Sequence, residues 1–178
     1  GMSPYEAFAR EIGIWSGPGK LKDLDRKTYS IAKAMDLGLG YGCGPAKFVT
    51  VARIMGGKDA EAVIEERADA LREASREDFD GEMTYTYTRK GAVLEVCKQI
   101  VEQFREKNPE VVGMWNFWDN AFHRNVGGGF NMDLPSGRSI RYSNIQWRFF
   151  TDELTGKRKR SLTAITDGVR VRRFWGGT

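Results

Sequence analysis

The segment from Trp115 to Ile140, WNFWDNAFHRNVGGGFNMDLPSGRSI, divides the sequence into two regions with different hydrophobic periods. Before its run of three glycines, apolar residues recur at the spacing of three and four that is typical of helices. After Gly127-Gly128-Gly129 the apolar residues alternate, and turn residues separate short runs rich in Ile, Thr, Val, Tyr and Phe. The sequence therefore predicts an α+β fold, with a mainly helical region over residues 1–128 and a small antiparallel sheet over residues 129–178.

Local signals place the individual elements. Ser3-Pro4-Tyr5-Glu6 begins a helix, because a serine suits the N-cap and a proline suits the first helical position. Asp25 is likewise a suitable N-cap for a second helix. The predicted helices cover residues 3–13, 25–41, 45–55, 60–74, 93–104 and 109–123, with a loop at 15–24 and a loop or short strand at 78–89. The predicted strands cover residues 129–134, 139–150, 159–165 and 169–175.

Composition limits the class of protein. The chain has 178 residues, of which 40% are hydrophobic, and this is enough to bury a core. Cys43 and Cys97 lie far apart, with a single histidine elsewhere, so we expect structural thiols and no metal site. No apolar run approaches the roughly 20 residues that cross a bilayer. We therefore expect a soluble, cytoplasmic protein with no membrane partner.

The positive charge is concentrated at the C-terminal end. Residues 136–178 contain ten Lys or Arg and three acidic residues, whereas the rest of the chain has 18 basic and 21 acidic residues. Aromatic residues are interleaved with this basic block, namely Tyr142, Trp147, Phe149, Phe150, Phe174 and Trp175. Such a composition favours a surface that contacts phosphates and stacks on bases. A solvated face of a β-hairpin is the alternative interpretation.

The most unusual stretch is KAMDLGLGYG, from Lys33 to Gly42. Lys33, Leu37 and Tyr41 recur every four residues and so share one face of the predicted helix, with Tyr29 one turn earlier. Arg26 lies about two turns before Lys33. The resulting face mixes charged, aromatic and apolar side chains, which fits neither a buried core face nor an ordinary solvated one.

Gly38 and Gly40 lie inside this helix or at its end, where each glycine costs roughly 0.5–1 kcal/mol relative to alanine. That cost indicates the close approach of another backbone or a ligand, or a bend. The spacing does not complete the G-x-G-x-x-G of dinucleotide-binding folds, because its last position falls on Cys43 or Pro45. A phosphate-binding P-loop is also excluded, since no Gly-Lys-Ser/Thr follows.

The stretch from Ser30 to Gly42 resembles motif B of family A DNA polymerases, the O helix of the fingers subdomain. That motif has the pattern Arg-x3-Lys-x3-Phe/Tyr/Leu-x3-Tyr-Gly, and Lys33, Leu37, Tyr41 and Gly42 match it in register. Further segments are similar to bacteriophage members in the same order, namely PYEAFA (4–9), FREKNPEVVGMWNFW (104–118), LPSGR (134–138) and WGG (175–177). The resemblance thus covers nearly the whole chain.

The resemblance implies a role for each matched residue. Lys33 would be catalytic, because it would contact the triphosphate of the incoming dNTP and donate a proton to the leaving pyrophosphate. Leu37 would lie against the sugar and base of the dNTP. Tyr41 would pack near the templating base, and Gly42 would allow the template to approach closely.

One position departs from the family pattern. The arginine that precedes the lysine by four residues in the family is Tyr29 here. We therefore hypothesise that Arg26 supplies the missing positive charge to the nucleotide, or that the phosphates are held more weakly. In the same way, the resemblance implies that Arg138, Arg141 and Tyr142 face the DNA primer–template.

The catalytic metal ligands of the family are absent. In family A polymerases, Mg²⁺ ions are held by aspartates of motifs A and C, and neither motif occurs here. We therefore expect a fragment that does not polymerise DNA by itself, although its parent does. The fragment is also expected to self-associate through surfaces that the palm subdomain normally covers.

Two other classes of function remain as alternatives. A stand-alone basic module that binds nucleic acid without catalysis accounts for the charge, though it does not explain the register of Lys33, Leu37 and Tyr41. An enzyme acting on a small nucleotide is the third class, and the failed glycine spacing argues against it.

Overall fold

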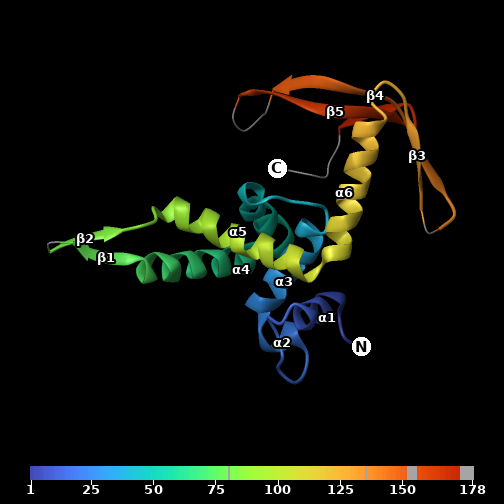
Figure 1. Cartoon of the computed structure of the whole chain (residues 1–178). Coiled ribbons are helices and arrows are strands. Elements are labelled where there is room, and N and C mark those ends of the chain that lie inside the picture. Colours follow the sequence, from blue (N-terminus) through green and yellow to red (C-terminus); the bar gives the residue numbers. More distant parts are fainter. Residues whose placement is uncertain (80, 135, 152–155, 173–178) are drawn as a thin grey trace. The chain divides into compact units, whose positions relative to one another are not determined.

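The computed structural model describes residues 1–79, 81–134, 136–151 and 156–172 (Figure 1). It is an α+β structure, as predicted, with helices and two antiparallel sheets. The chain divides into two compact units, the first from Gly1 to Val111 and the second beginning at Val112. The predicted regional boundary lies later, at residue 128, because the hydrophobic period changes there.

The first unit begins with α1 (Pro4–Glu11), α2 (Leu21–Leu24) and α3 (Arg26–Leu39). Ser3 caps α1 as expected, since its hydroxyl accepts a hydrogen bond from the Glu6 amide at 3.2 Å. The carboxylate of Glu6 is buried and accepts the amide of Leu21, also at 3.2 Å. That bond satisfies a buried backbone donor at the start of α2, which explains why a short helix replaces part of the loop predicted at 15–24.

Helix α3 begins as predicted and ends earlier. The Asp25 carboxylate accepts the Thr28 amide at 2.9 Å and the Thr28 hydroxyl at 2.6 Å, and these bonds hold the pKa of Asp25 below its usual value. The helix ends at Leu39, whose carbonyl accepts the Gly42 amide at 2.8 Å. Gly42 has a φ of 75°, which favours glycine. The prediction that the helix continues to Tyr41 was therefore wrong, because a turn closes at Gly42.

Helix α4 (Pro45–Ala74) joins the two helices predicted at 45–55 and 60–74. Gly57 interrupts it with a φ of 72° and a ψ of −163°, so the element is kinked at the predicted gap. Helices α3 and α4 pack closely at two glycines. A side chain on Gly38 would collide with Val51, and a Cβ on Gly56 would lie 2.5 Å from the Ser30 carbonyl oxygen. The close approach predicted at Gly38 is therefore to a neighbouring helix.

The rest of the first unit is a hairpin and a long helix. Strands β1 (Arg76–Phe79) and β2 (Glu82–Tyr85) pair antiparallel, and α5 (Arg89–Lys107) follows. Figure 1 shows α4 and α5 side by side, with the hairpin continuing beyond their joined ends. Apolar residues from α1 to α5 form the core, and the largest of them are Leu21, Ile31, Met35, Leu39, Phe48, Ile64, Ile100 and Val101.

The second unit contains most of α6 (Pro109–Arg124) and one four-stranded sheet. Its strands β3 (Phe130–Asp133), β4 (Ser139–Thr151), β5 (Arg158–Thr166) and β6 (Val169–Arg172) are antiparallel neighbours in chain order. The predicted strands are thus confirmed, although the expected end of the last one at residue 175 lies outside the described residues. Phe122 packs on the sheet in a small core whose other members are Ile145, Leu162 and Ala164.

Candidate functional site

A cleft of about 840 Å³ lies in the first unit beside α3. Four helices contribute to it, and we call it the α3 cleft. Its lining residues are Tyr5, Lys22, Asp23, Arg26, Tyr29, Ser30, Lys33, Ile54, Met55, Gly56, Gly57 and Asp59. The cleft thus contains three of the residues that the sequence analysis selected for nucleotide binding, Arg26, Tyr29 and Lys33.

The helical period explains why these three residues meet. Arg26, Tyr29 and Lys33 occupy successive turns of one face of α3, so their side chains lie above one another. The opposite face carries Ile31 and Met35, which are buried in the core and fix the rotation of the helix. The polar face therefore lines the cleft because the apolar face packs inside.

The charge of the cleft is positive. Its cations are Lys22, Arg26 and Lys33, and its carboxylates are Asp23 and Asp59. Arg26 forms an ion pair with Asp59, with 3.0 Å between Nε and Oδ2, and the arginine side chain remains 83% exposed. Such an exposed pair contributes little stability, so the guanidinium can exchange Asp59 for another anion at small cost.

Tyr29 serves as a wall of the cleft. Its ring packs edge to face on Tyr5, with 5.7 Å between the ring centroids. The Lys22 ammonium lies 6.0 Å from the Tyr29 ring centroid, at the outer limit of a cation–π contact. Tyr29 therefore lies near a cation of the cleft, although it carries no positive charge itself.

The other predicted residues of this region do not line the cleft. Leu37 is half-buried one turn beyond Lys33. Tyr41 is 80% exposed in the turn that follows α3, and Gly42 is buried in the same turn. The four-residue spacing places Leu37 on the same face as Lys33, but the early end of the helix separates Tyr41 from that face.

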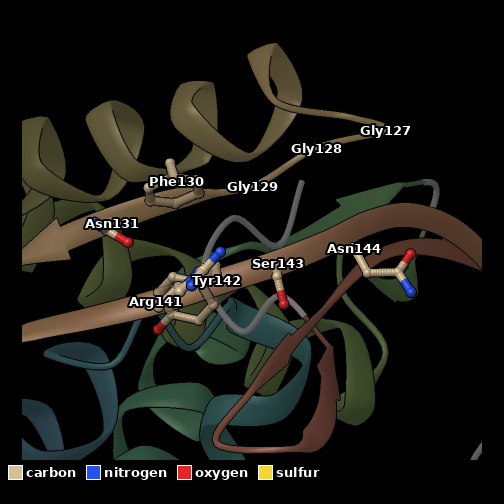
Figure 2. Close-up of a pocket in the computed structure, with 9 residues that line it drawn as sticks. All are labelled: Gly127, Gly128, Gly129, Phe130, Asn131, Arg141, Tyr142, Ser143 and Asn144. Atoms are coloured by element: carbon tan, nitrogen blue, oxygen red, sulfur yellow. The ribbon is translucent and has the colours of Figure 1, made fainter.

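The second unit contains another cleft, of about 580 Å³, which Figure 2 shows. Its lining combines the glycine run between α6 and β3 with neighbouring residues of β3 and β4, namely Gly127, Gly128, Gly129, Phe130, Asn131, Arg141, Tyr142, Ser143 and Asn144. Of the residues predicted to contact DNA, Arg141 and Tyr142 therefore line one cleft. Arg138 is exposed in the turn before β4 and does not line it.

Packing constrains this second cleft. The Tyr142 ring contacts Phe122 and Phe130, with centroid distances of 5.0 and 5.4 Å, and burial raises the pKa of its hydroxyl. A side chain on Gly129 would collide with the carbonyl oxygen of Tyr142. Tyr142 therefore has a structural role in the core, and Gly129 is required for the backbone to pass β4.

Metal ligands are not gathered in the described part of the chain. Within residues 1–79, 81–134, 136–151 and 156–172, no three His, Cys, Asp or Glu side chains lie close enough together to hold an ion. The carboxylates Asp23 and Asp59 of the α3 cleft are only a pair. No ligands of the Mg²⁺ ions that the family resemblance implies are therefore assigned among the described residues.

Tyr5, Lys22 and Asp59 of the α3 cleft were not predicted as site residues. Tyr5 lay in a stretch noted only for its helix start and its resemblance to phage polymerases. Lys22 was placed in a loop, and Asp59 fell between two predicted helices. The consecutive glycines Gly56-Gly57, inside an otherwise helical pattern, were the signal that could have indicated a cleft there.

Comparison with known proteins finds no matching family model, no similar curated protein and no similar solved structure. Among the described residues, none of the helices has both the length and the apolar character that a membrane crossing requires. A function is therefore inferred from the residues and their geometry.

Proposed function

We propose that this chain is the nucleotide-binding part of a family A DNA polymerase, and that the α3 cleft binds the triphosphate of an incoming dNTP. The observation that carries this proposal is the convergence of Arg26, Tyr29 and Lys33 on one positively charged cleft. Of these three residues, Lys33 matches motif B in register, and Arg26 and Tyr29 lie on the preceding turns of the same helix face. The motif and the cleft therefore have Lys33 in common.

The cleft offers the chemistry that phosphoryl-type transfer needs from protein groups. Positioning and charge stabilisation dominate that reaction, and a lysine supplies both. Lys33 neutralises the triphosphate and donates a proton to the departing pyrophosphate. Arg26 exchanges Asp59 for a phosphate oxygen and so supplies the charge that Tyr29 lacks. No step is assigned to Mg²⁺, because the described residues do not gather its ligands, and the chain is not expected to polymerise DNA alone.

The proposed role also includes binding of the primer–template. Tyr41 is exposed, so its ring is available to stack near a templating base, with Gly42 beside it. Leu37 contacts the sugar and base of the nucleotide. In the second unit, Arg138 and Arg141 contact DNA phosphates, and Tyr142 supports Arg141 on β4. This role implies a cytoplasmic location, and self-association through surfaces that the rest of the polymerase would cover.

Calorimetric titration with a dNTP tests the proposal. Replacement of Lys33 by alanine removes a charge-assisted contact to phosphate and is expected to weaken binding about tenfold. Lys47→Ala is the matched control, because Lys47 is an exposed lysine outside the cleft. The corresponding deoxynucleoside, which lacks phosphates, is expected not to bind measurably.

The Arg26–Asp59 pair gives a test of opposite sign. Asp59→Asn removes a negative charge and frees Arg26, so it is expected to strengthen dNTP binding several-fold, whereas Arg26→Ala is expected to weaken it. Equal dNTP affinities for the unmodified chain, Lys33→Ala and Asp59→Asn would contradict the proposed site. Unchanged affinity in Arg26→Ala alone would reject only the substitution of Arg26 for the family arginine.

A further inference from the structure

The β4–β5 hairpin carries two aromatic and two arginine side chains on one face, Trp147, Phe149, Arg158 and Arg160, which we call the hairpin surface. In the register of the two strands, Phe149 is directly opposite Arg160, and Trp147 is opposite Leu162. Directly paired residues share a face, as do residues two apart along a strand. All four side chains of the hairpin surface therefore point to the same side of the sheet.

Along the strands, the side chains on this face change from buried to exposed. Ile145 and Leu162 are buried in the core of the second unit, and Trp147 touches His123 of α6 with 5.7 Å between ring centroids. Further along, Trp147 is 40% exposed and Phe149 is 63% exposed. The strands thus extend beyond the core and present aromatic rings to solvent.

Each exposed ring lies beneath an arginine. The Arg158 guanidinium lies 4.3 Å from the Phe149 ring centroid, and the Arg160 guanidinium lies 4.7 Å from the Trp147 ring centroid. Both arginines reach diagonally across the strand pair, so the arrangement repeats. Rings and planar cations therefore alternate over the hairpin surface.

Strands β4 and β5 themselves carry no negative charge to balance these arginines; Asp152 and Glu153, which lie between the two strands in sequence, are outside the described residues. Within the described part of the chain, neither Arg158 nor Arg160 forms an ion pair with a carboxylate. Arg148 and Lys159 on the same strands add further positive charge. Such a positively charged surface is complementary to an anionic partner.

We propose that the hairpin surface binds single-stranded DNA, with bases stacked on Trp147 and Phe149 and phosphates bound by Arg158 and Arg160. An acidic peptide would satisfy the arginines, but it has no flat bases for the exposed rings. Duplex DNA also fits less well, because its bases are already stacked on one another and hide their faces. A single strand offers both phosphates and accessible bases.

Binding exchanges one set of contacts for another. An exposed cation–π contact is weak, and stacking of a base on an aromatic ring is stronger. A base can therefore take the place of a guanidinium on the ring, and the released arginine reaches the adjacent phosphate. The binding surface itself does not depend on the α3 cleft; only the choice of DNA over RNA rests on the proposed function.

Fluorescence anisotropy with the full chain tests the hairpin surface. The probe is a labelled oligothymidylate of about ten nucleotides, within the range of site sizes known for single-strand binding. An abasic strand of equal length has the same phosphates and no bases. A duplex of equal length has phosphates and bases, but its base faces are hidden by stacking. The oligothymidylate is expected to bind at least about tenfold more tightly than either.

Variants separate stacking from charge. The double substitution Trp147→Ala and Phe149→Ala is expected to reduce oligothymidylate affinity to that of the abasic strand. Phe149→Leu keeps apolar volume without a π face and is expected to weaken binding with unchanged circular dichroism. Arg158→Gln is expected to lower the slope of log K against log salt by about 0.7. Lys98→Gln on α5 removes equal charge elsewhere and serves as the matched control.

Three outcomes would overturn the inference. Equal binding of the abasic strand and the oligothymidylate would show attraction by charge alone. Retained affinity in Phe149→Leu and in the double variant would place binding elsewhere. Tighter binding of an oligouridylate would reject the choice of DNA. Because Lys33→Ala leaves the hairpin unchanged, loss of dNTP binding and loss of oligonucleotide binding are separable results.

Discussion

The thiol of Cys97 is buried on α5, and this burial raises its pKa to about 11, with a smaller contribution from the nearby Cys43. Burial also raises the pKa of Cys43, which is half-buried. Only the thiolate reacts with alkylating reagents, so both cysteines are expected to be slow nucleophiles near neutral pH. Both thiols are free in the structure, and their structural role stays a prediction.

Alkylation of a Cys43→Ser variant by iodoacetamide measures the reactivity of Cys97 alone. At pH 8 about one Cys97 in a thousand is ionised, so reaction is expected to be slow and to accelerate about tenfold for each pH unit up to 10. In urea the same cysteine is expected to react rapidly at pH 8. Rapid, pH-independent alkylation of the folded variant would contradict the buried position of Cys97.

The positions of some site residues follow from sequence spacing, whereas those of others depend on the packing of two helices. Arg26, Tyr29 and Lys33 share a helix face by spacing alone, and that part of the prediction needed only the helical period. The ion pair between Arg26 and Asp59 joins α3 to a residue of α4. No local pattern indicated it, because the two residues meet only when the two helices pack.

At the scale of elements, the crossing of α3 and α4 depends on Gly38. Replacement by alanine would drive its Cβ into Val51, a β-branched residue with little rotamer freedom. Overpacking of this kind typically costs about 1–3 kcal/mol, which exceeds the gain in helix propensity. We therefore expect Gly38→Ala to lower the free energy of unfolding, measured by urea denaturation.

A compensating substitution provides the control. Val51→Ala removes the methyl group that collides, leaving the next Val51 atom at 3.6 Å from the added Cβ. The double variant is therefore expected to be more stable than Gly38→Ala, with a coupling free energy of about 1 kcal/mol or more in a double-mutant cycle. Strict additivity of the two substitutions would show that Gly38 does not lie against Val51.

The boundaries of elements were predicted less well than their existence. The helix at Arg26 stops before Tyr41, because the turn at Gly42 satisfies the Leu39 carbonyl. In contrast, the gap predicted between the helices at 45–55 and 60–74 is confirmed, since Gly57 leaves the helical conformation inside it. Both interruptions arise at glycines, whose conformational freedom lets the surrounding structure decide their backbone angles.

At the scale of the whole molecule, the two units have separate cores of different size. Phe122 of α6 fills the small core of the second unit against Ile145 and Leu162. Phe122→Ala leaves a cavity there and is expected to cost about 3–5 kcal/mol. Amide hydrogen exchange is expected to accelerate throughout β4 and β5, with protection in α3 and α4 unchanged.

The exchange experiment also tests the division of the chain. Ile64→Ala, in the core of the first unit, is the reciprocal variant and is expected to affect α3 and α4 without exposing β4. Loss of protection in both units from either substitution would mean that the chain unfolds as one cooperative structure.

The sequence by itself determined the α+β class, the order of helices before sheet, and the helix face that carries Arg26, Tyr29 and Lys33. These features follow from hydrophobic period, capping residues and turn residues, which act over a few positions of the chain. Only the tertiary structure decided that Lys22 and Asp59 join that face in a cleft, and that arginines of β5 cover the rings of β4. Such contacts join residues distant in sequence, and their geometry is set by helix packing and strand register.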